Sequence, residues 1–134
     1  KLVELANAES DAISEALDEK EYEELATALG KGGGKALKEL EKEQKTRTTR
    51  MVRDSLDAAL LDIATLYRDI MMIQSGHVDS LINIEMAEEI RTLATILPTH
   101  RTIQKLDAIM KARKNLGYNA APLLTIEALM CELV

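Results

Sequence analysis

The stretch from Val52 to Gln74 constrains the fold of this chain more than any other part of the sequence. Its apolar residues recur at the i, i+3, i+4 and i+7 positions of one helical face. They are Leu56, Ala59, Leu60, Ile63, Leu66, Tyr67, Ile70 and Ile73. A second apolar set widens this face, so we expect a helix that other helices cover on more than one side. That set comprises Leu61, Ala64, Met71 and Met72.

The polar residues of the same stretch are expected to line its remaining strip. They are Asp54, Asp57, Asp62, Arg68 and Asp69. The composition agrees with a helical fold, because the chain has six Gly and two Pro, no Phe or Trp, and only three Tyr in 134 residues. The absence of runs of aromatic and β-branched residues favours helices over strands. We therefore predict an all-α fold, an antiparallel bundle of five to seven helices in one domain.

Other apolar stripes and punctuating residues predict the remaining helices. The expected ranges are about 2–17, 22–29, from 35 onward, 85–97, 101–116 and 122–133. Gly30 suits a helix C-cap, Asn83 an N-cap and Pro122 the first helical position. The first helix should have one apolar face, made by Leu2, Leu5, Ala6, Ala12, Ile13, Ala16 and Leu17. Glu41–Arg50 has no apolar residue, and the sequence leaves open whether it is helical or broken.

Charge is distributed unevenly around a net charge of −6. Residues 1–29 carry nine acidic and two basic groups, whereas residues 30–53 carry eight basic and three acidic groups. We predict an N-terminal helical segment at 1–29, a Gly-rich linker at 30–35 and a helical domain at 36–134. The chain starts at Lys1 within a helical pattern, so we expect it to be a piece of a longer protein.

Few residues indicate chemistry. Gly30–Ala36 is rich in glycine, but it lacks the first glycine and the final hydroxyl of a phosphate-binding loop, which favours a linker. His77, His100 and the single Cys131 lie far apart in sequence, without the spacing of a metal site. We predict no catalytic, cofactor-binding or metal-binding residue, and no small-molecule ligand. With no apolar run of ~20 residues, no signal peptide and one cysteine, we expect a cytoplasmic protein without membrane contact.

The basic run from Lys38 to Arg53 is the clearest charge feature. Its candidate contact residues, for weak binding of nucleic acid or of another subunit, are Lys42, Lys45, Arg47, Arg50 and Arg53. Interleaved Glu39, Glu41 and Glu43 favour a solvated helix or a subunit contact over nucleic-acid binding. The run also lacks aromatic residues on which bases could stack.

Two stretches resemble a known family. Leu40–Gly76, whose long helix includes YRDI, and Ala112–Leu133, with N-x-x-P-L-L-x-I-E-A-L, are similar to the C-terminal region of delta-prime subunits of bacterial DNA polymerase III clamp loaders. High-GC Gram-positive bacteria come closest in character. The resemblance implies that residues 36–134 form a collar domain, an oligomerisation domain that holds a pentameric loader together for loading the sliding clamp in DNA replication. The partners it implies are the gamma/tau and delta subunits, with DNA contacted only indirectly or weakly.

The resemblance carries over no catalytic residue, because the ATPase-like part of that family is not in this chain. Two alternatives stay open: the collar domain of a gamma/tau subunit, and a DNA-contacting helical module that uses the basic run. A third possibility, a metal-dependent bundle enzyme, has the least support, because the chain lacks the Glu-x-x-His pairs of di-iron bundles.

Overall fold

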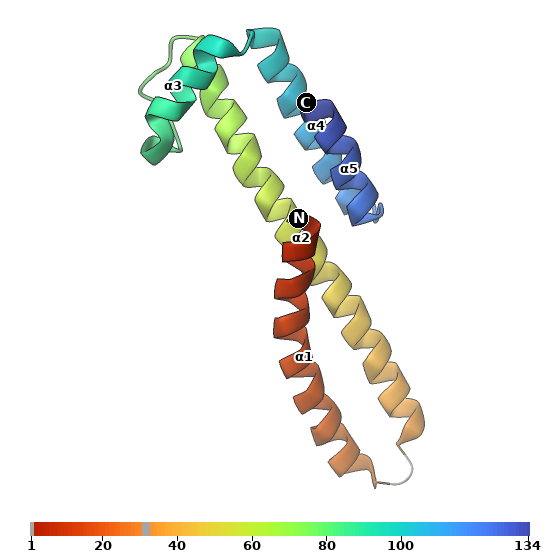
Figure 1. The fold of residues 1–134 in the computed structure, drawn as a ribbon. Helices are drawn as coiled ribbons and strands as arrows, with labels where there is room; N and C mark the ends of the chain where they lie inside the picture. Colours follow the sequence, from red (N-terminus) through yellow and green to blue (C-terminus); the bar gives the residue numbers. More distant parts are fainter. Residues whose placement is uncertain (1, 31–32) are drawn as a thin grey trace. The chain divides into compact units, whose positions relative to one another are not determined.

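The computed structural model describes residues 2–30 and 33–134, with all side chains except those of residues 2, 3, 6 and 10. The fold of these residues is all-helical (Figure 1), with five α-helices and one short 3-10 helix, η2. The elements are α1 (Leu2–Leu29), α2 (Gly34–Gln74), η2 (Ile84–Met86), α3 (Ala87–Ile96), α4 (Thr99–Gly117) and α5 (Pro122–Leu133). The number of α-helices is at the lower end of the predicted range.

The chain divides into two compact units, Lys1–Leu56 and Asp57–Val134, and the boundary falls within α2. This division follows the packing of the residues. The assignment of oligomerisation to residues 36–134 is a separate, functional expectation and stays a prediction. Among the described residues, no helix has the length and apolar character needed to cross a membrane.

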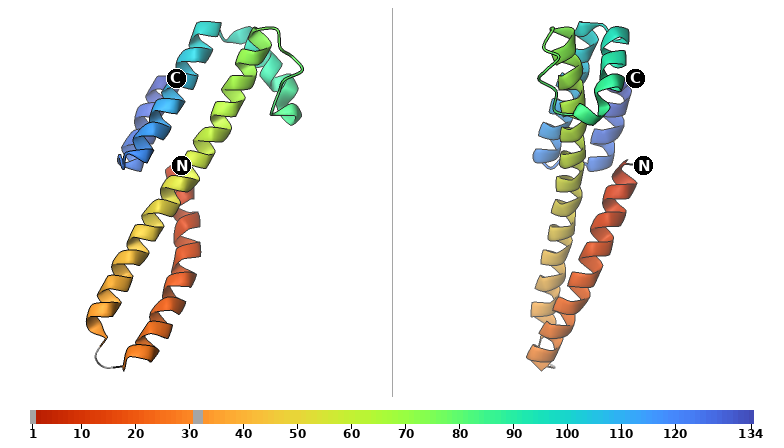
Figure 2. Two further views of the ribbon diagram at one scale, coloured as in Figure 1. Left: turned by 180° about the vertical axis from the view of Figure 1, so that it is seen from behind. Right: turned by 90° about the vertical axis from the view of Figure 1, so that its left-hand side faces the viewer.

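In the first unit, α1 runs beside the first part of α2 as a helical hairpin (Figures 1 and 2). The prediction of two separate segments within 1–29 was wrong, because α1 is one helix from Leu2 to Leu29. The junction, Asp18–Glu21, contains neither Gly nor Pro and is compatible with a continuous helix. Two of its carboxylates, Asp18 and Glu21, also bind Arg47 of α2.

The predicted apolar face of α1 is not buried within the described residues. Leu5, Ile13 and Leu17 are 63%, 48% and 46% exposed. The face that α1 turns toward α2 is instead centred on Ser14, which is buried and lies beside Thr48. The side chains of Leu2 and Ala6, also assigned to that face, lie outside the described residues.

The glycine-rich turn behaves as its sequence predicts at one end. Gly30 has a φ of 57°, the left-handed conformation expected of a helix C-cap. Gly33 approaches Leu29 so closely that an added Cβ would lie 2.8 Å from the Leu29 Cβ. Lys31 and Gly32 of the predicted linker lie outside the described residues, and α2 begins at Gly34, one residue before the expected start.

Glu41–Arg50 is helical, which settles the question that the sequence left open. The hydroxyls of Thr46, Thr48 and Thr49 each donate to the carbonyl four residues earlier. These bonds satisfy the hydroxyls within the helix, where a threonine side chain is otherwise neutral to unfavourable. The helix therefore continues through a segment without a single apolar side chain.

The second unit contains the core predicted around the end of α2. Leu60 and Ile70 of α2 are fully buried, as are Ile90 of α3 and Ile109 of α4. The side chain of Gln74 donates to the carbonyls of Ala94 and Leu97 at the end of α3. The core therefore draws on side chains of α2, α3 and α4.

α4 and α5 pack side by side as an antiparallel pair (Figures 1 and 2). The turn between them includes Asn119, whose φ is 62°. Pro122 occupies the first turn of α5, as predicted. Lys105 of α4 donates to the carbonyl of Leu133 near the end of α5, where helical carbonyls lack an intrahelical partner.

Candidate functional site

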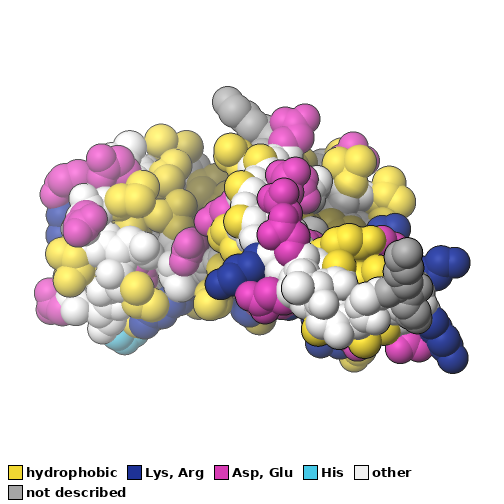
Figure 3. Space-filling view, turned by 90° about the horizontal axis from the view of Figure 1, so that it is seen from below, with side chains coloured by type: hydrophobic (Ala, Val, Ile, Leu, Met, Phe, Trp, Pro, Cys, Tyr) yellow, Lys and Arg dark blue, Asp and Glu magenta, His cyan; other side chains and the backbone are white. Residues whose placement is uncertain are grey.

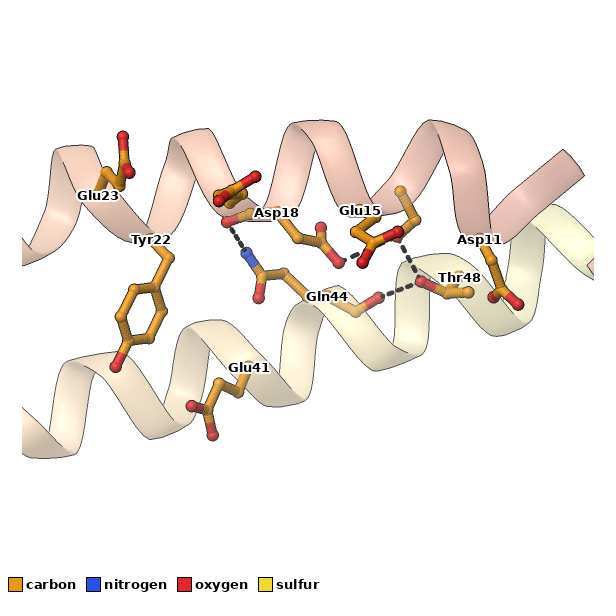
Figure 4. A pocket seen from close by; sticks show the side chains of 10 residues that line it. Asp11, Glu15, Asp18, Tyr22, Glu23, Glu41, Gln44 and Thr48 are labelled. Atoms are coloured by element: carbon orange, nitrogen blue, oxygen red, sulfur yellow. Dashed lines mark hydrogen bonds between the residues drawn. The ribbon is translucent and has the colours of Figure 1, made fainter. Parts of the chain in front are cut away.

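A groove of about 870 Å³ lies along one side of the α1–α2 hairpin (Figure 4). Six of its ten lining side chains are carboxylates, five of them from α1. The lining residues are Asp11, Ser14, Glu15, Asp18, Glu19, Tyr22, Glu23, Glu41, Gln44 and Thr48. Uncompensated carboxylates at this density attract positively charged groups. We call this surface the acidic groove.

Polar side chains form the floor of the acidic groove. The hydroxyls of Ser14 and Thr48 lie 2.6 Å apart, and the Ser14 hydroxyl also lies within hydrogen-bond distance of the Asp18 carboxylate, at 3.0 Å. The Gln44 amide donates to the backbone carbonyl of Asp18 at 3.1 Å, a bond drawn in Figure 4. The two helices are therefore joined here by hydrogen bonds, where a helical hairpin more often has apolar contacts.

Arg47 of α2 links the two helices of the hairpin through ion pairs with carboxylates of α1. Its guanidinium donates to both carboxylate oxygens of Glu21, at 3.1 and 2.8 Å, and to Asp18 at 2.9 Å. The hydrogen bonds from Arg47 lower the pKa of Glu21, and those to Glu21 and Asp18 raise the pKa of Arg47. The geometry is the two-pronged arrangement that a guanidinium forms with a carboxylate.

The five candidate residues of the basic run differ in exposure and in ion pairing. Lys42, Lys45 and Arg50 are exposed, whereas Arg47 and Arg53 are half-buried. Arg47 is committed to carboxylates of α1, so it is not free to meet a phosphate. The sequence predicts the positive charge of this run correctly but does not reveal this pairing, which depends on a partner 26 residues away in the chain.

No described residues converge as a metal site. Within residues 2–30 and 33–134 there is no group of three or more His, Cys, Asp or Glu side chains with suitable geometry. His77, His100 and Cys131 are all exposed. Cys131 lies on α5 and is a free thiol.

Asp69 forms a polar site that sequence reasoning missed. We expected it on the solvent-facing strip of α2, but it is fully buried. It accepts hydrogen bonds from the backbone N–H groups of Ile82 and Asn83, from the Asn83 amide at 2.8 Å and from Arg68 at 2.8 Å. Arg68 also donates to the carbonyl of Ser80. Asp69 therefore holds the loop that leads from α2 into η2.

Asn83 was predicted as an N-cap, and this expectation holds only in part. It occupies the N-cap position of η2, but its side chain makes no capping hydrogen bond. The side-chain amide donates instead to Asp69 and to Thr65. No signal in the sequence marks this pairing, because the partners are 14 residues apart and one of them belongs to a loop.

A second ion pair ties α2 to α4 within the second unit. Arg113 donates through Nε and Nη2 to the two carboxylate oxygens of Asp57, at 2.7 and 2.9 Å. The hydrogen bonds from Arg113 lower the pKa of Asp57. This pair fixes the position of α4 along α2.

The outward side of α5 is apolar. Leu123, Leu124 and Met130 are 55%, 66% and 40% exposed. The only charged residues of this helix are Glu127 and Glu132. Hydrophobic side chains also reach the surface on the face drawn in Figure 3, where they lie among carboxylates. Exposed apolar side chains of this kind are common at protein–protein contacts, although here the exposed Glu127 lies among them.

Comparisons with known proteins leave this geometry without a precedent. No family model matches the chain, and neither a curated protein nor a solved structure is significantly similar to it. Function must therefore be inferred from the surfaces of the chain and from the two stretches of sequence that resemble a known family.

Proposed function

We propose that this chain is an assembly domain of a bacterial DNA polymerase III clamp loader, the collar region of a delta-prime subunit. Its role is to hold neighbouring subunits in place while the loader acts on the sliding clamp. The two stretches of sequence similarity, Leu40–Gly76 and Ala112–Leu133, support this assignment. Both contribute to the second unit, where α4 and α5 pack together.

The observation that carries the proposal is the apolar outward side of α5. A helix that needed only to cover its own core would have polar side chains on its other face. Here Ile126 and Leu129 already pack inward, and Leu123, Leu124 and Met130 are left at the surface. Burying such side chains in a contact is favourable by about 25 cal/mol per Å². A second protein surface is the partner that this arrangement fits.

Charged groups lie among and beside the apolar side chains. Lys111 of α4 lies 3.4 Å from Glu132 of α5, and Glu127, one helical turn from Leu123 and Met130, is exposed between them. Such a mixture of apolar and charged side chains is compatible with a subunit interface. A homologous collar domain of a gamma/tau or delta subunit would present a matching surface.

The test is assembly with the sister subunits. The chain is mixed with purified gamma/tau and delta subunits, and the mass of the complex is measured by light scattering after gel filtration. We expect a complex with the wild-type chain and its loss with Leu124→Asp combined with Met130→Asp. The matched control is Leu5→Asp combined with Leu17→Asp, which changes two exposed leucines of α1 and should leave the complex intact.

A mass equal to that of the separate components would contradict the proposal. The alternative, a DNA-contacting module, makes a different prediction for the same chain. It requires binding to DNA that weakens with salt and that is lost when Lys42, Lys45 and Arg50 are changed to Ala. The commitment of Arg47 to α1 carboxylates weighs against that alternative. The gamma/tau alternative is separated by asking which subunit the chain replaces in a reconstituted loader.

A further inference from the structure

The two helices of the hairpin carry opposite charge. Residues 2–29, which form α1, include nine carboxylates and one lysine. The part of α2 from Gly34 to Arg53 has seven basic residues and three acidic ones. We propose that the hairpin is a self-association surface, on which α1 of one copy packs against α2 of a second copy. This surface is distinct from the α5 side used for the proposed assembly function.

Most of these charges are not neutralised within one copy. Arg47 is the only basic residue that forms an ion pair between the helices in the described part of the hairpin. Lys38, Lys42 and Lys45 are exposed and have no ion-pair partner there. On α1, the exposed carboxylates along the acidic groove are Asp11, Glu15, Glu19 and Glu23. A second copy of the chain supplies the lysines that these carboxylates lack.

The hairpin is also incompletely packed on its groove side. The seam is polar at Ser14, Gln44 and Thr48, and the groove beside it is open. Tyr22 lines this groove and is 39% exposed. Tyrosine is enriched among the residues that dominate binding energy at protein interfaces. A pair of helices laid over the groove would cover Tyr22.

The hydrogen bonds across the seam fix the height of each charged residue, which is its position along the axis of the hairpin. Ser14 lies beside Thr48, and Asp18 lies beside Gln44. A step of four residues forward along α1 therefore corresponds to a step of four residues back along α2. Lys45 therefore lies at the height of residue 17, and Lys42 at the height of residue 20. A two-fold axis parallel to the helices leaves these heights unchanged. It places Lys45 of a second copy between Glu15 and Glu19, and Lys42 between Glu19 and Glu23.

The distribution of charge favours this parallel two-fold axis over a perpendicular two-fold axis. A two-fold axis perpendicular to the helices, in the plane between the hairpins, would lay α1 on α1 and bring the carboxylates together. Like charges opposite one another are unfavourable, so specificity comes from the repulsion as well as from the attraction. The parallel axis also makes every neighbouring pair of helices antiparallel, which is the arrangement of a four-helix bundle.

The hairpin is large enough for such a contact. A helix of this length spans about 40 Å, and two helices side by side are about 20 Å wide. Each copy would then bury about 800 Å², which is the share of one partner in an interface of standard size. The contact is therefore of the size that stable, specific complexes use.

Two variants of the full chain with reversed charge test the proposal. The first has lysines of α2 changed to glutamate, at Lys38→Glu, Lys42→Glu and Lys45→Glu. The second has glutamates of α1 changed to lysine, at Glu15→Lys, Glu19→Lys and Glu23→Lys. We expect wild type to sediment as a dimer at high concentration, each variant alone to be monomeric, and an equimolar mixture of the two variants to be dimeric again.

The matched control reverses three exposed carboxylates of the second unit. Its substitutions are Glu85→Lys, Glu89→Lys and Glu127→Lys. It changes net charge as much as the α1 variant does, and it should still form dimers. A monomeric wild type, variants that still dimerise alone, or a mixture that stays monomeric would each overturn the proposal. Because the chain is tested without other subunits, none of these results depends on the proposed clamp-loader function.

Cysteine cross-linking gives a second measurement if a variant loses helicity by circular dichroism. Chains with Glu19→Cys and with Lys42→Cys are prepared on a Cys131→Ser background. Mixed in oxidised glutathione, they should form a disulfide-linked heterodimer, because the two positions face each other in the proposed pair. Glu19→Cys alone should cross-link far less, since α1 does not face α1. Equal cross-linking of the two samples would contradict the pairing.

Discussion

Replacing Asp69 by alanine should destabilise the second unit more than any other change of a single polar side chain described above. The carboxylate is fully buried and holds two backbone N–H groups, those of Ile82 and Asn83, together with the Asn83 amide and Arg68. Removing it leaves these donors without an acceptor. We expect the loop between α2 and η2 to lose its attachment to α2.

The magnitude follows from the number of donors and their access to water. A hydrogen bond to a charged group contributes about 1.5–3 kcal/mol. Arg68 is partly exposed and can rebind water, so the loss is concentrated in the two backbone groups and the Asn83 amide. Removing the carboxylate also removes the cost of burying its charge, which offsets part of the loss. The free energy of unfolding should fall by about 3 kcal/mol.

Hydrogen exchange is the appropriate assay because it reports on each of the two compact units separately. The amides of Ile82 and Asn83 should exchange much faster in Asp69→Ala, and denaturant should unfold the second unit at a lower midpoint. The control is Asp62→Ala, an exposed carboxylate on the same helix. A fall in stability below about 1 kcal/mol, or equal effects at both positions, would refute the role assigned to Asp69.

The same site predicts a dependence on pH. Burial is the largest single influence and raises the pKa of Asp69, but the hydrogen bonds from Asn83, Ile82 and Arg68 together outweigh it and lower the pKa. A carboxyl whose pKa is lower in the folded state stabilises the fold above its unfolded pKa of about 4. That contribution is lost as the pH falls through the folded pKa. Asp69→Asn should therefore be less stable near neutral pH and lose less stability on acidification, as followed by urea unfolding.

Three smaller changes test other parts of the fold. Arg113→Ala removes the two-pronged pair with Asp57. Because the Asp57 side chain is 43% exposed, a double-mutant cycle measured by urea unfolding should give a coupling free energy of about 1 kcal/mol or less. No measurable coupling would mean that the pair does not fix the position of α4. Gly30→Ala puts a side chain at a φ of 57°, and thermal unfolding should show a loss of about 1 kcal/mol; an unchanged transition would mean that the turn adapts. Thr102→Val should be neutral or stabilising by about 1 kcal/mol in urea unfolding, because the buried Thr102 hydroxyl has no hydrogen-bond partner among the described residues. Clear destabilisation would mean that this hydroxyl is satisfied.

Local signals predicted much of the helical architecture. Gly30 and Pro122 mark helix boundaries through backbone conformation, which depends on the residue itself, and both predictions are confirmed. The apolar periodicity of the end of α2 predicted the burial of Leu60 and Ile70. These features need no knowledge of distant residues.

Two of the failures depend on pairings that are distant in the sequence. Asp69 was read as a surface residue because its carboxylate is polar, and the donors that make its burial possible belong to a loop 13 and 14 residues later. Arg47 was read as part of a free basic surface because its partners lie on another helix. A local pattern gives the charge and the helical face of a residue but not the group that it meets.

An apolar stripe indicates that something covers it, but not whether the cover belongs to the same chain. α1 and α5 show both sides of this ambiguity. The stripe of α1 was predicted as one apolar face, and Ile13 and Leu17 on it are about half exposed in the described chain. α5 is apolar on two sides, and one copy of the chain covers only the side of Ile126 and Leu129. Because exposed apolar surface is unfavourable in water, both helices fit a chain that completes its packing in an assembly, through α5 with sister subunits and through the hairpin with a second copy.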